Sequence, residues 1–218
     1  MILILLGAPG AGKGTQAEAL ATATGAAHIA TGDLFRAEIA TGSALGLQAK
    51  SFIDAGKLVP DAVTIGMILS RLAQPDAGNH VILDGFPRNV AQAEALDAAL
   101  AHSARNLAAI LLEVDRDALV ARISGRRICG GCGRSYHLTK NPPKHEGTCD
   151  GCGGALTMRS DDAPETVAAR MTNQLTALDA VVAFYRASSR LQVVDGDGEI
   201  GDVGKRLARA AAAVGLHE

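Results

Sequence analysis

The chain has 218 residues, of which 48% are hydrophobic, and a formal net charge of −2. This size and composition suit one large domain, or one domain with inserted lobes, around a full hydrophobic core. The slightly acidic balance argues against a dedicated nucleic-acid or membrane-surface protein, since such proteins usually carry a basic excess. No stretch approaches the roughly 18 apolar residues that span a bilayer, and the first apolar run has no signal-peptide flanks, so we expect a cytoplasmic protein.

A glycine-rich segment, GAPGAGKGT at residues 7–15, follows the first apolar run and precedes a helix-like stretch. Its glycines let the backbone turn successive N–H groups toward phosphate oxygens, and the helix N-terminus adds partial positive charge. Lys13 is placed to reach the β and γ phosphates of a nucleotide. Gly14 stands where the usual pattern has Ser or Thr, so Thr15 is the candidate contact to phosphate or to the Mg²⁺ shell. The segment predicts a phosphate-binding loop, and a purely structural turn is the alternative.

Strand and helix patterns alternate along the chain. Continuous apolar runs predict strands buried on both faces at Met1–Leu6, Val81–Leu83, Leu107–Val114 and Leu191–Val194. Segments rich in Ala and Leu predict helices at Gln16–Ala23, Leu34–Ala40, Ala62–Ala73, Val90–Ala101, Ala118–Ile123 and Val167–Tyr185. This order favours an α/β fold in which crossover helices join parallel strands.

Two regions interrupt the alternation. From Thr31 to about Pro60, short helical pieces separated by glycines predict a small helical insertion, with Thr31 as the cap of a helix that begins at Gly32. From Arg126 to about Asp162, the composition changes to Cys, Gly, Pro, Lys and His. This second region is too long for a simple loop and must contain its own organising element.

The cysteines supply that element. They form two CxxC pairs separated by 16 residues and surrounded by glycines, at Cys129, Cys132, Cys149 and Cys152. Four thiolates on two tight turns predict a closed tetrahedral Zn²⁺ site with a structural role, and the metal would supply most of the folding free energy of so short a segment. A redox pair and disulfides are the alternatives. His137 and His145 lie nearby but are not needed as ligands.

Several arginines stand at the ends of predicted elements. A solvated surface charge is the ordinary explanation for any one of them. Neighbouring Gly, Pro and Thr residues favour contact with phosphate for Arg36, Arg88, Arg126 and Arg159. Arg122 suits a surface charge equally well, and Arg127 is expected to be structural.

Two aspartates are candidates for the Mg²⁺ shell. Asp84 closes an apolar strand and precedes a glycine, so it can hold Mg²⁺ directly or through water, or can cap the following turn. Asp33 can join the same water shell, or it can simply place a charge at a helix N-terminus.

The motifs together resemble one family. GAPGAGKGTQA, TGDLFR, GKLVPD, LDGFPRNVAQAEAL, GRRIC, YHLTKNPPK and RSDDAPETVAAR are similar to segments of adenylate kinases of the long form, whose lid holds zinc. The match covers essentially the whole chain in order. It implies a P-loop-type parallel five-stranded sheet flanked by helices, with core segments 1–29, 60–125 and 164–218, a helical AMP-binding insertion at 30–59 and a zinc-binding lid at 126–163.

The resemblance also implies roles for single residues. On the ATP side it places Gly10, Ala11, Gly12, Lys13, Gly14, Thr15, Arg126, Ser135, Tyr136 and the backbone of Gly198, although the DGDGE loop around Gly198 departs from the family in residue type. Around AMP it places Thr31, Arg36, Lys57, Leu58, Val59, Gly85, Phe86, Pro87, Arg88, Gln92, Arg159 and Arg170. Lys13, Arg88, Arg126, Arg159 and Arg170 form the expected catalytic set. Asp84 and Asp33, chosen above from their places in the sequence, form the expected magnesium shell.

The implied reaction is the reversible transfer of the terminal phosphoryl group of Mg-ATP to AMP, which gives two ADP. A monomer without nucleic-acid or membrane partners is expected. Other interpretations stay open: a kinase for UMP, CMP or GMP, a kinase that uses GTP as donor, and a zinc-ribbon nucleic-acid binder with a regulatory nucleotide domain. Gln92 can recognise an adenine edge, or it can be an ordinary helix glutamine. A GTPase is disfavoured because the chain has no NKxD motif.

Overall fold

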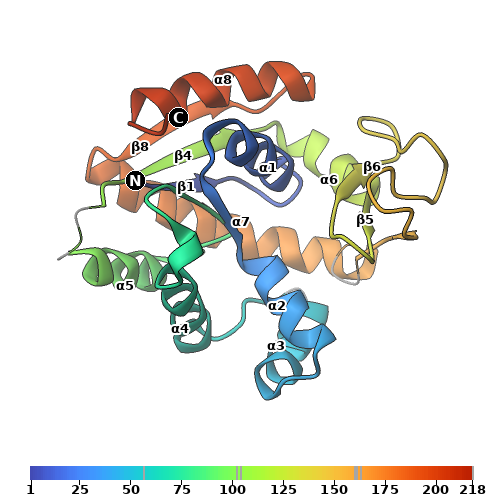
Figure 1. Ribbon diagram of the computed structural model, residues 1–218, viewed down its shortest axis with the longest axis horizontal. Coiled ribbons are helices and arrows are strands. Elements are labelled where there is room, and N and C mark those ends of the chain that lie inside the picture. Colours follow the sequence, from blue (N-terminus) through green and yellow to red (C-terminus); the bar gives the residue numbers. More distant parts are fainter. Residues whose placement is uncertain (56, 102, 104, 160–161, 163, 218) are drawn as a thin grey trace.

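The computed structural model describes residues 1–55, 57–101, 103, 105–159, 162 and 164–217. Its centre is a parallel five-stranded sheet with the strand order β2-β3-β1-β4-β8 (Figure 1). The strands are β1 (Ile2–Leu6), β2 (Ala27–Ala30), β3 (Val81–Asp84), β4 (Leu107–Glu113) and β8 (Leu191–Asp195). The predicted α/β fold with a parallel sheet is confirmed.

Helices cover both faces of this sheet. They are α1 (Lys13–Thr24), α2 (Thr31–Ala40), α3 (Ala44–Asp54), α4 (Asp61–Leu72), α5 (Val90–Leu100), α6 (Arg116–Ser124), α7 (Pro164–Ala187) and α8 (Ile200–Ala213), with a 3₁₀ turn at Pro75–Ala77. Figure 1 shows α8 along one side of the sheet and α4 and α5 on the other. Among the described helices, none combines the length and the apolar composition that crossing a membrane requires.

The central strand β1 shows why its sequence is apolar throughout. Ile2, Ile4 and Leu6 pack into one core, which α4, α5 and α7 complete. Leu3 and Leu5 pack into a second core with α1 and α8 on the opposite face. Successive side chains of a strand point to opposite faces, so a strand between two helical layers needs an apolar residue at every position.

A small lobe formed by α2 and α3 has its own core. Phe35, Ala49 and Val59 are buried there, and Met67 of α4 packs against them. Ser43 caps α3, since its side-chain oxygen accepts a hydrogen bond from the backbone N–H of Gly46 at 2.9 Å. The predicted helical insertion is therefore present as a packed unit beside the sheet.

A second small unit lies at the far end of α6. Its three-stranded antiparallel sheet has the order β6-β5-β7, formed by β5 (Arg126–Cys129), β6 (Ser135–His137) and β7 (Leu156–Thr157). Figure 1 shows this sheet set apart from the main one. Its interior consists of Cys129, Tyr136 and Cys149, with Leu156 packed against them. The cysteine-containing segment thus has an interior centred on the predicted metal ligands.

Besides the strands of the cysteine-containing unit, the strand β2 and the helix α8 lie outside the set of elements predicted from the sequence. β2 is an edge strand in which only Ile29 is buried, so it has no apolar run. α8 buries Val203, Leu207 and Ala211, spaced four residues apart. The predicted cap at Thr31 is wrong, because Thr31 is the first residue of α2 and its side chain does not cap the helix.

Candidate functional site

The glycine-rich segment forms the turn between β1 and α1, as predicted. Gly10 and Gly12 have φ angles of 84° and 89°, which L side chains rarely adopt. A Cβ at Gly10 would also lie 2.8 Å from the backbone oxygen of Leu119, so only glycine fits. No side chain in the described part of the chain caps the N-terminus of α1, and its N–H groups therefore remain suited to an anion.

Lys13 is folded over this turn. Its Nζ donates hydrogen bonds to the backbone oxygens of Gly7, at 2.8 Å, and Ala8, at 3.0 Å. The ammonium group is therefore held above the loop, where a phosphate bound by the backbone N–H groups would meet it. This geometry supports the predicted phosphate contact of Lys13.

Asp84 lies beside the loop because β3 pairs with β1, and Leu5 is its register partner. A Cβ on Gly14 would be 3.4 Å from Asp84 Oδ2, so the absence of a side chain at Gly14 leaves the carboxylate next to the start of α1. Burial raises the pKa of Asp84, but His28, Lys13 and Arg88 lower it more, and the net shift is downward. Asp84 is consequently a carboxylate at neutral pH, the type of oxygen ligand that Mg²⁺ prefers.

A second polar group follows β3. Thr31 donates from Oγ1 to the backbone oxygen of Gly85 at 2.8 Å, and Arg88 donates from Nε to the same oxygen at 2.7 Å. These bonds fix the direction of the Arg88 guanidinium. The two loops that follow β1 and β3 are neighbours because their strands are neighbours, so Lys13 and Arg88 both line the same cleft.

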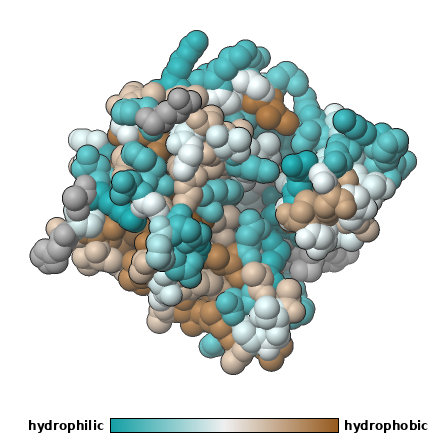
Figure 2. Space-filling view, in the orientation of Figure 1, coloured by the Kyte–Doolittle hydropathy of each residue, from teal (hydrophilic) through white to brown (hydrophobic). Residues whose placement is uncertain are grey.

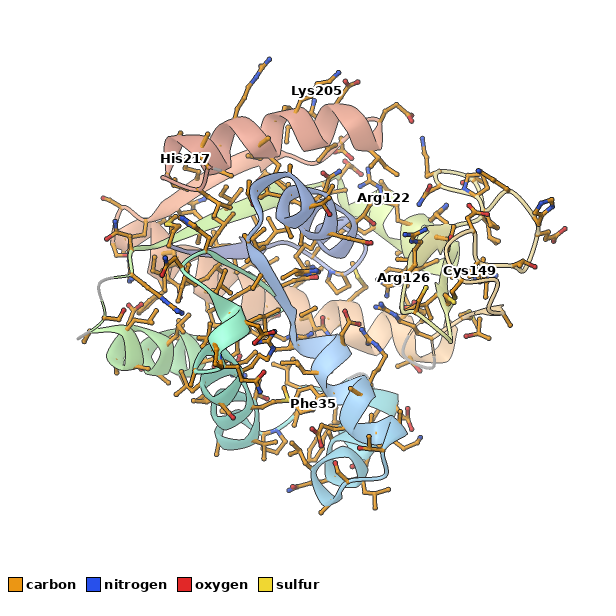
Figure 3. The ribbon with its side chains drawn as sticks, in the orientation of Figure 1. Phe35, Arg122, Arg126, Cys149, Lys205 and His217 are labelled. Carbon is orange, nitrogen blue, oxygen red and sulfur yellow. The ribbon has the colours of Figure 1, made fainter. Side chains whose placement is uncertain are left out.

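Helix α6 and the cysteine-containing unit contribute further arginines to the cleft. Arg126, at the start of β5, forms a two-pronged ion pair with Asp162, whose side chain is fully buried; its Nε lies 2.7 Å from Asp162 Oδ2. Arg122 of α6 donates to Asp197 Oδ1 at 2.9 Å and to the backbone oxygen of Gly196 at 3.3 Å. Figure 3 shows Arg122 and Arg126 between the sheet and the cysteine-containing unit.

The four cysteines come together in that unit. Their Sγ atoms all lie within 4.8 Å of one another, with 3.3 Å between Cys129 and Cys152 and 3.5 Å between Cys132 and Cys149. Four sulfurs at about 2.3 Å from a tetrahedral zinc ion would be about 3.8 Å apart, so the cluster fits such an ion.

Hydrogen bonds favour the thiolate form of Cys129 and Cys149, whereas the neighbouring sulfurs outweigh a backbone hydrogen bond from Gly154 and raise the pKa of Cys152. The hydroxyl of Tyr136 contacts Cys149 Sγ at 3.4 Å, and this contact, together with the backbone N–H groups of Cys152 and Gly151, lowers the pKa of Cys149 to about 6. Backbone N–H groups of Gly131 and Gly151 donate to Cys129 and Cys149. Since thiolates are the metal-binding form, these contacts suit a metal site better than a disulfide.

One cleft, of ≈ 1030 Å³, runs between the sheet, the α2–α3 lobe and the cysteine-containing unit. Sites for one small ligand usually span about 300–1,000 Å³, so this cleft is at the upper end of the range. Figure 2 shows that the face of the molecule in this view is largely hydrophilic, with apolar residues mainly in its lower half.

Comparison with known proteins identifies the family to which this chain belongs. Residues 5–190 match the family model described as Adenylate kinase. An adenylate kinase of Lysinibacillus sphaericus (strain C3-41) is 51% identical over 204 residues, which cover 93% of this chain and 94% of that protein. One from Streptomyces griseus is 50% identical over 215 residues and covers 98% of both chains, and one from Salinispora tropica is 48% identical over 211 residues, covering 96% and 97%.

The chain belongs to the adenylate kinase family. The resemblance seen in the sequence motifs is thereby confirmed, together with the enzyme class, a nucleoside monophosphate kinase. The nucleic-acid-binding alternative has no support in these relatives.

Most of the site residues expected from the sequence and from the adenylate kinase resemblance line the cleft. These are Gly10, Ala11, Gly12, Lys13, Gly14, Thr15, Thr31, Asp33, Arg36, Lys57, Leu58, Val59, Asp84, Gly85, Pro87, Arg88, Gln92, Arg126, Ser135, Tyr136, Arg159 and Gly198. Phe86 instead packs into the core, with 1% of its surface exposed. The side chain of Arg170 lies outside the described residues.

Three of these residues, Asp33, Arg36 and Tyr136, form ion pairs or hydrogen bonds within the protein. Asp33 forms an ion pair with Arg36 one helical turn later. The hydroxyl of Tyr136 is directed into the interior of the cysteine-containing unit, where it also accepts a hydrogen bond from the backbone N–H of Asp150 at 2.8 Å. Tyr136 can therefore contact a nucleotide through its backbone but not through its hydroxyl.

Sequence reasoning did not assign the cleft residues His28 and Lys140 to the nucleotide site, nor did it identify Asp61, which contacts the cleft residue Gln92. His28 lies on β2, with Nε2 3.8 Å from Asp84 Oδ2. Lys140 of the cysteine-containing unit lies 3.5 Å from Glu199, which precedes α8. Asp61 bonds to Gln92. Each acts through a partner distant in sequence, so no local motif could have identified it.

Proposed function

We propose that this protein transfers the terminal phosphoryl group of Mg-ATP reversibly to AMP, giving two ADP. The observation that carries the proposal is the single cleft into which the phosphate loop with Lys13 and the loop with Arg88 both open. Two nucleotides bound from opposite sides would meet end to end between these cations. Membership in the adenylate kinase family supports the same reaction.

Alignment and charge neutralisation carry the chemistry in this proposal. The attacking oxygen of AMP is already anionic at neutral pH, so no general base is required. Lys13 and Arg88 approach the transferring group from the core, while Arg126, Arg159 and Arg170 are the cations of the lid side. Together they stabilise the negative charge that spreads over the oxygens of the group in flight.

The two nucleotides have separate sites in the proposal. The phosphate loop, Gly10 to Thr15, holds ATP together with Arg126, Ser135, Tyr136 and Gly198. The other side of the cleft holds AMP through residues of α2, of the segment before α4 and of the loop after β3, namely Thr31, Arg36, Lys57, Leu58, Val59, Gly85, Phe86, Pro87, Arg88 and Gln92. Arg159 and Arg170 bridge the two. The adenine of AMP is assigned to the Gln92 side, since Gln92 lines the cleft.

Magnesium enters as part of the substrate Mg-ATP. It neutralises phosphate charge, and the ionised Asp84 is the residue of this chain best suited to hold its shell. Asp33 is a second member if it exchanges its ion pair with Arg36 for that shell. Zinc is assigned to the four cysteines, where it would stabilise the lid rather than react, because four thiolates close its coordination.

The lid has a separate task, the exclusion of water. Water competes with AMP as acceptor, so the cleft must close while the phosphates react. We assign residues 126–163 to this lid, 30–59 to the AMP-binding lobe, and 1–29, 60–125 and 164–218 to the core. The proposal further includes a monomer in the cytoplasm, where reduced cysteines favour metal binding.

A coupled assay of ADP formation tests the proposal. ATP with AMP and Mg²⁺ should give rapid ADP formation, while UMP, CMP or GMP as acceptor, or GTP as donor, should give far less. Lys13→Met should abolish transfer. Lys205→Met serves as matched control, since Lys205 is an exposed lysine of α8 that pairs with Asp202 (Figure 3). Equal rates with AMP and UMP, or an active Lys13→Met variant, would contradict the proposal.

A further inference from the structure

The side-chain amide of Gln92 is bonded at both ends. Its Oε1 accepts a hydrogen bond from the backbone N–H of Arg88 at 2.7 Å, and its Nε2 donates to Asp61 Oδ1 at 2.8 Å. Asn89 Nδ2 donates to the same Asp61 oxygen at 2.8 Å. Gln92 is only 1% exposed and lies at the wall of the cleft.

These partners allow one orientation of the amide. A backbone N–H can only donate, so it requires the oxygen of Gln92; an ionised carboxylate can only accept, so it requires the nitrogen. A flipped amide would place two donors against each other at Arg88 and two acceptors against each other at Asp61. The two ends together favour one orientation of the amide, and of the two only Asp61 contributes through a side chain, which a substitution can remove.

The carboxylate of Asp61 is itself held in place. Asp61 is the first residue of α4, and Asn89 is the N-cap of α5, where its Oδ1 accepts from the backbone N–H of Gln92 at 2.9 Å. Two helix N-termini thus meet at this carboxylate, and their partial positive charges attract it. The orientation of Gln92 is therefore built into the packing of α4 against α5.

We propose that Asp61 determines base specificity by fixing the orientation of the Gln92 amide toward the purine of the nucleoside monophosphate. Each amide atom has one hydrogen-bonding position left after its bond to the protein. Adenine presents an acceptor at N1 and a donor at its 6-amino group, whereas hypoxanthine presents a donor and an acceptor at the same positions. An amide held in one orientation matches the first pattern and opposes the second. This inference rests on the proposed function, because it assumes that AMP is the acceptor.

Asp61 acts as a positioning residue, so its effect must appear as selectivity between bases. Arg88 does not depend on Asp61 for its direction, because its Nε is held by the backbone oxygen of Gly85. Loss of Asp61 should consequently change the recognition of the base more than the turnover at saturation.

The test compares AMP with IMP as acceptor for the wild-type protein and three variants. In Asp61→Ala, the ratio of kcat/KM for AMP to that for IMP should fall about tenfold, which corresponds to about 1.4 kcal/mol. Its kcat with saturating AMP should stay within about threefold, as expected when only uniform binding is lost. Asp61→Asn keeps a carbonyl oxygen at the shared position and should retain the wild-type ratio. Asp76→Ala, which removes an exposed carboxylate paired with Arg71, is the matched control and should change nothing.

An unchanged ratio in Asp61→Ala, or an equal fall in Asp61→Asn, would overturn the inference. If Asp61→Ala does not fold, the inference can still be tested on the wild-type protein. The measurement is then the rate at which side-chain amide protons exchange in D₂O. The Gln92 amide should exchange more slowly than that of the exposed Gln48, and equal rates would overturn the inference. Failure of the proposed function would look different, since the wild-type protein would then fail to phosphorylate AMP at all.

Discussion

The four-cysteine cluster should hold the lid together, so its loss should unfold the lid before the core. Apart from the cysteines, the apolar interior of the described lid consists of Tyr136 and the partly buried Leu156. Burial of such side chains stabilises by about 1.5–3 kcal/mol each. Ordering one residue of backbone costs about 1–2 kcal/mol, so these two side chains offset only a few residues of the lid. Zinc bound by thiolates contributes about 10–16 kcal/mol in small domains, which exceeds the contribution of both side chains together.

The perturbation is chelation, or the substitution Cys149→Ser. Calorimetry should then show an additional transition at lower temperature, and limited proteolysis should cut within residues 130–158 while the core survives. Phosphoryl transfer is measured after the chelator has been removed and Mg²⁺ restored. Its rate should fall in proportion to the loss of lid structure seen by calorimetry and proteolysis, and not before it. His145→Ala is the control, since His145 is an exposed residue of the same unit and should leave metal stoichiometry at one per chain.

Two results would refute this reasoning. One is a protein shown to be free of metal that keeps both its melting temperature and the protease resistance of the lid. The other is a chelated, folded protein of unchanged stability that has lost phosphoryl transfer, which would mean that the metal takes part in the chemistry.

Three further predictions concern the core of the molecule. Arg88→Ala should lower kcat by about 10²–10³-fold, the usual loss for one transition-state donor, with little change in melting temperature; near-normal turnover would remove Arg88 from the catalytic set. Tyr185→Phe should stabilise the fold by about 1 kcal/mol and raise Tm by about 2–4 °C, because the buried Tyr185 hydroxyl has no hydrogen-bond partner among the described residues; a lower Tm would show that it has one. The lowered pKa of Asp84 means that its ionised form stabilises the fold above the unfolded-state pKa of 3.8, and that this contribution disappears as the pH falls through the lower folded-state pKa. Below about pH 4, the free energy of unfolding, measured with denaturant, should therefore change less with pH in Asp84→Asn than in the wild type. The same slope of this free energy against pH in both proteins would contradict the assignment.

The strands that could be predicted are those whose residues face two cores. β1 is apolar throughout because both of its faces are covered, and that requirement is visible in the sequence. β2 is a short edge strand with one buried side chain, Ile29, so burial leaves almost no trace in its composition. The five-stranded sheet was consequently available from the family resemblance but not from apolar runs alone.

The residues of the candidate site also fall into two groups, those that a local motif predicts and those whose contacts depend on tertiary packing. Lys13 and the cysteines belong to local motifs, in which the spacing itself encodes the turn that brings the atoms together. The contact between Asp61 and Gln92 depends instead on how two helices pack, and the approach of Asp84 to Gly14 depends on which strands are neighbours. Neither relation has a spacing that could be recognised in the chain.

The ion pair between Arg126 and Asp162 marks the place where the chain leaves the core for the lid and comes back. Because the two ends of this segment lie together, another segment or a short turn could replace it without changing the positions of α6 and α7. Changes of length and composition between these residues should therefore disturb the folding of the core less than equal changes within the sheet. This unit is the natural place to graft a foreign metal site or a reporter group onto the scaffold.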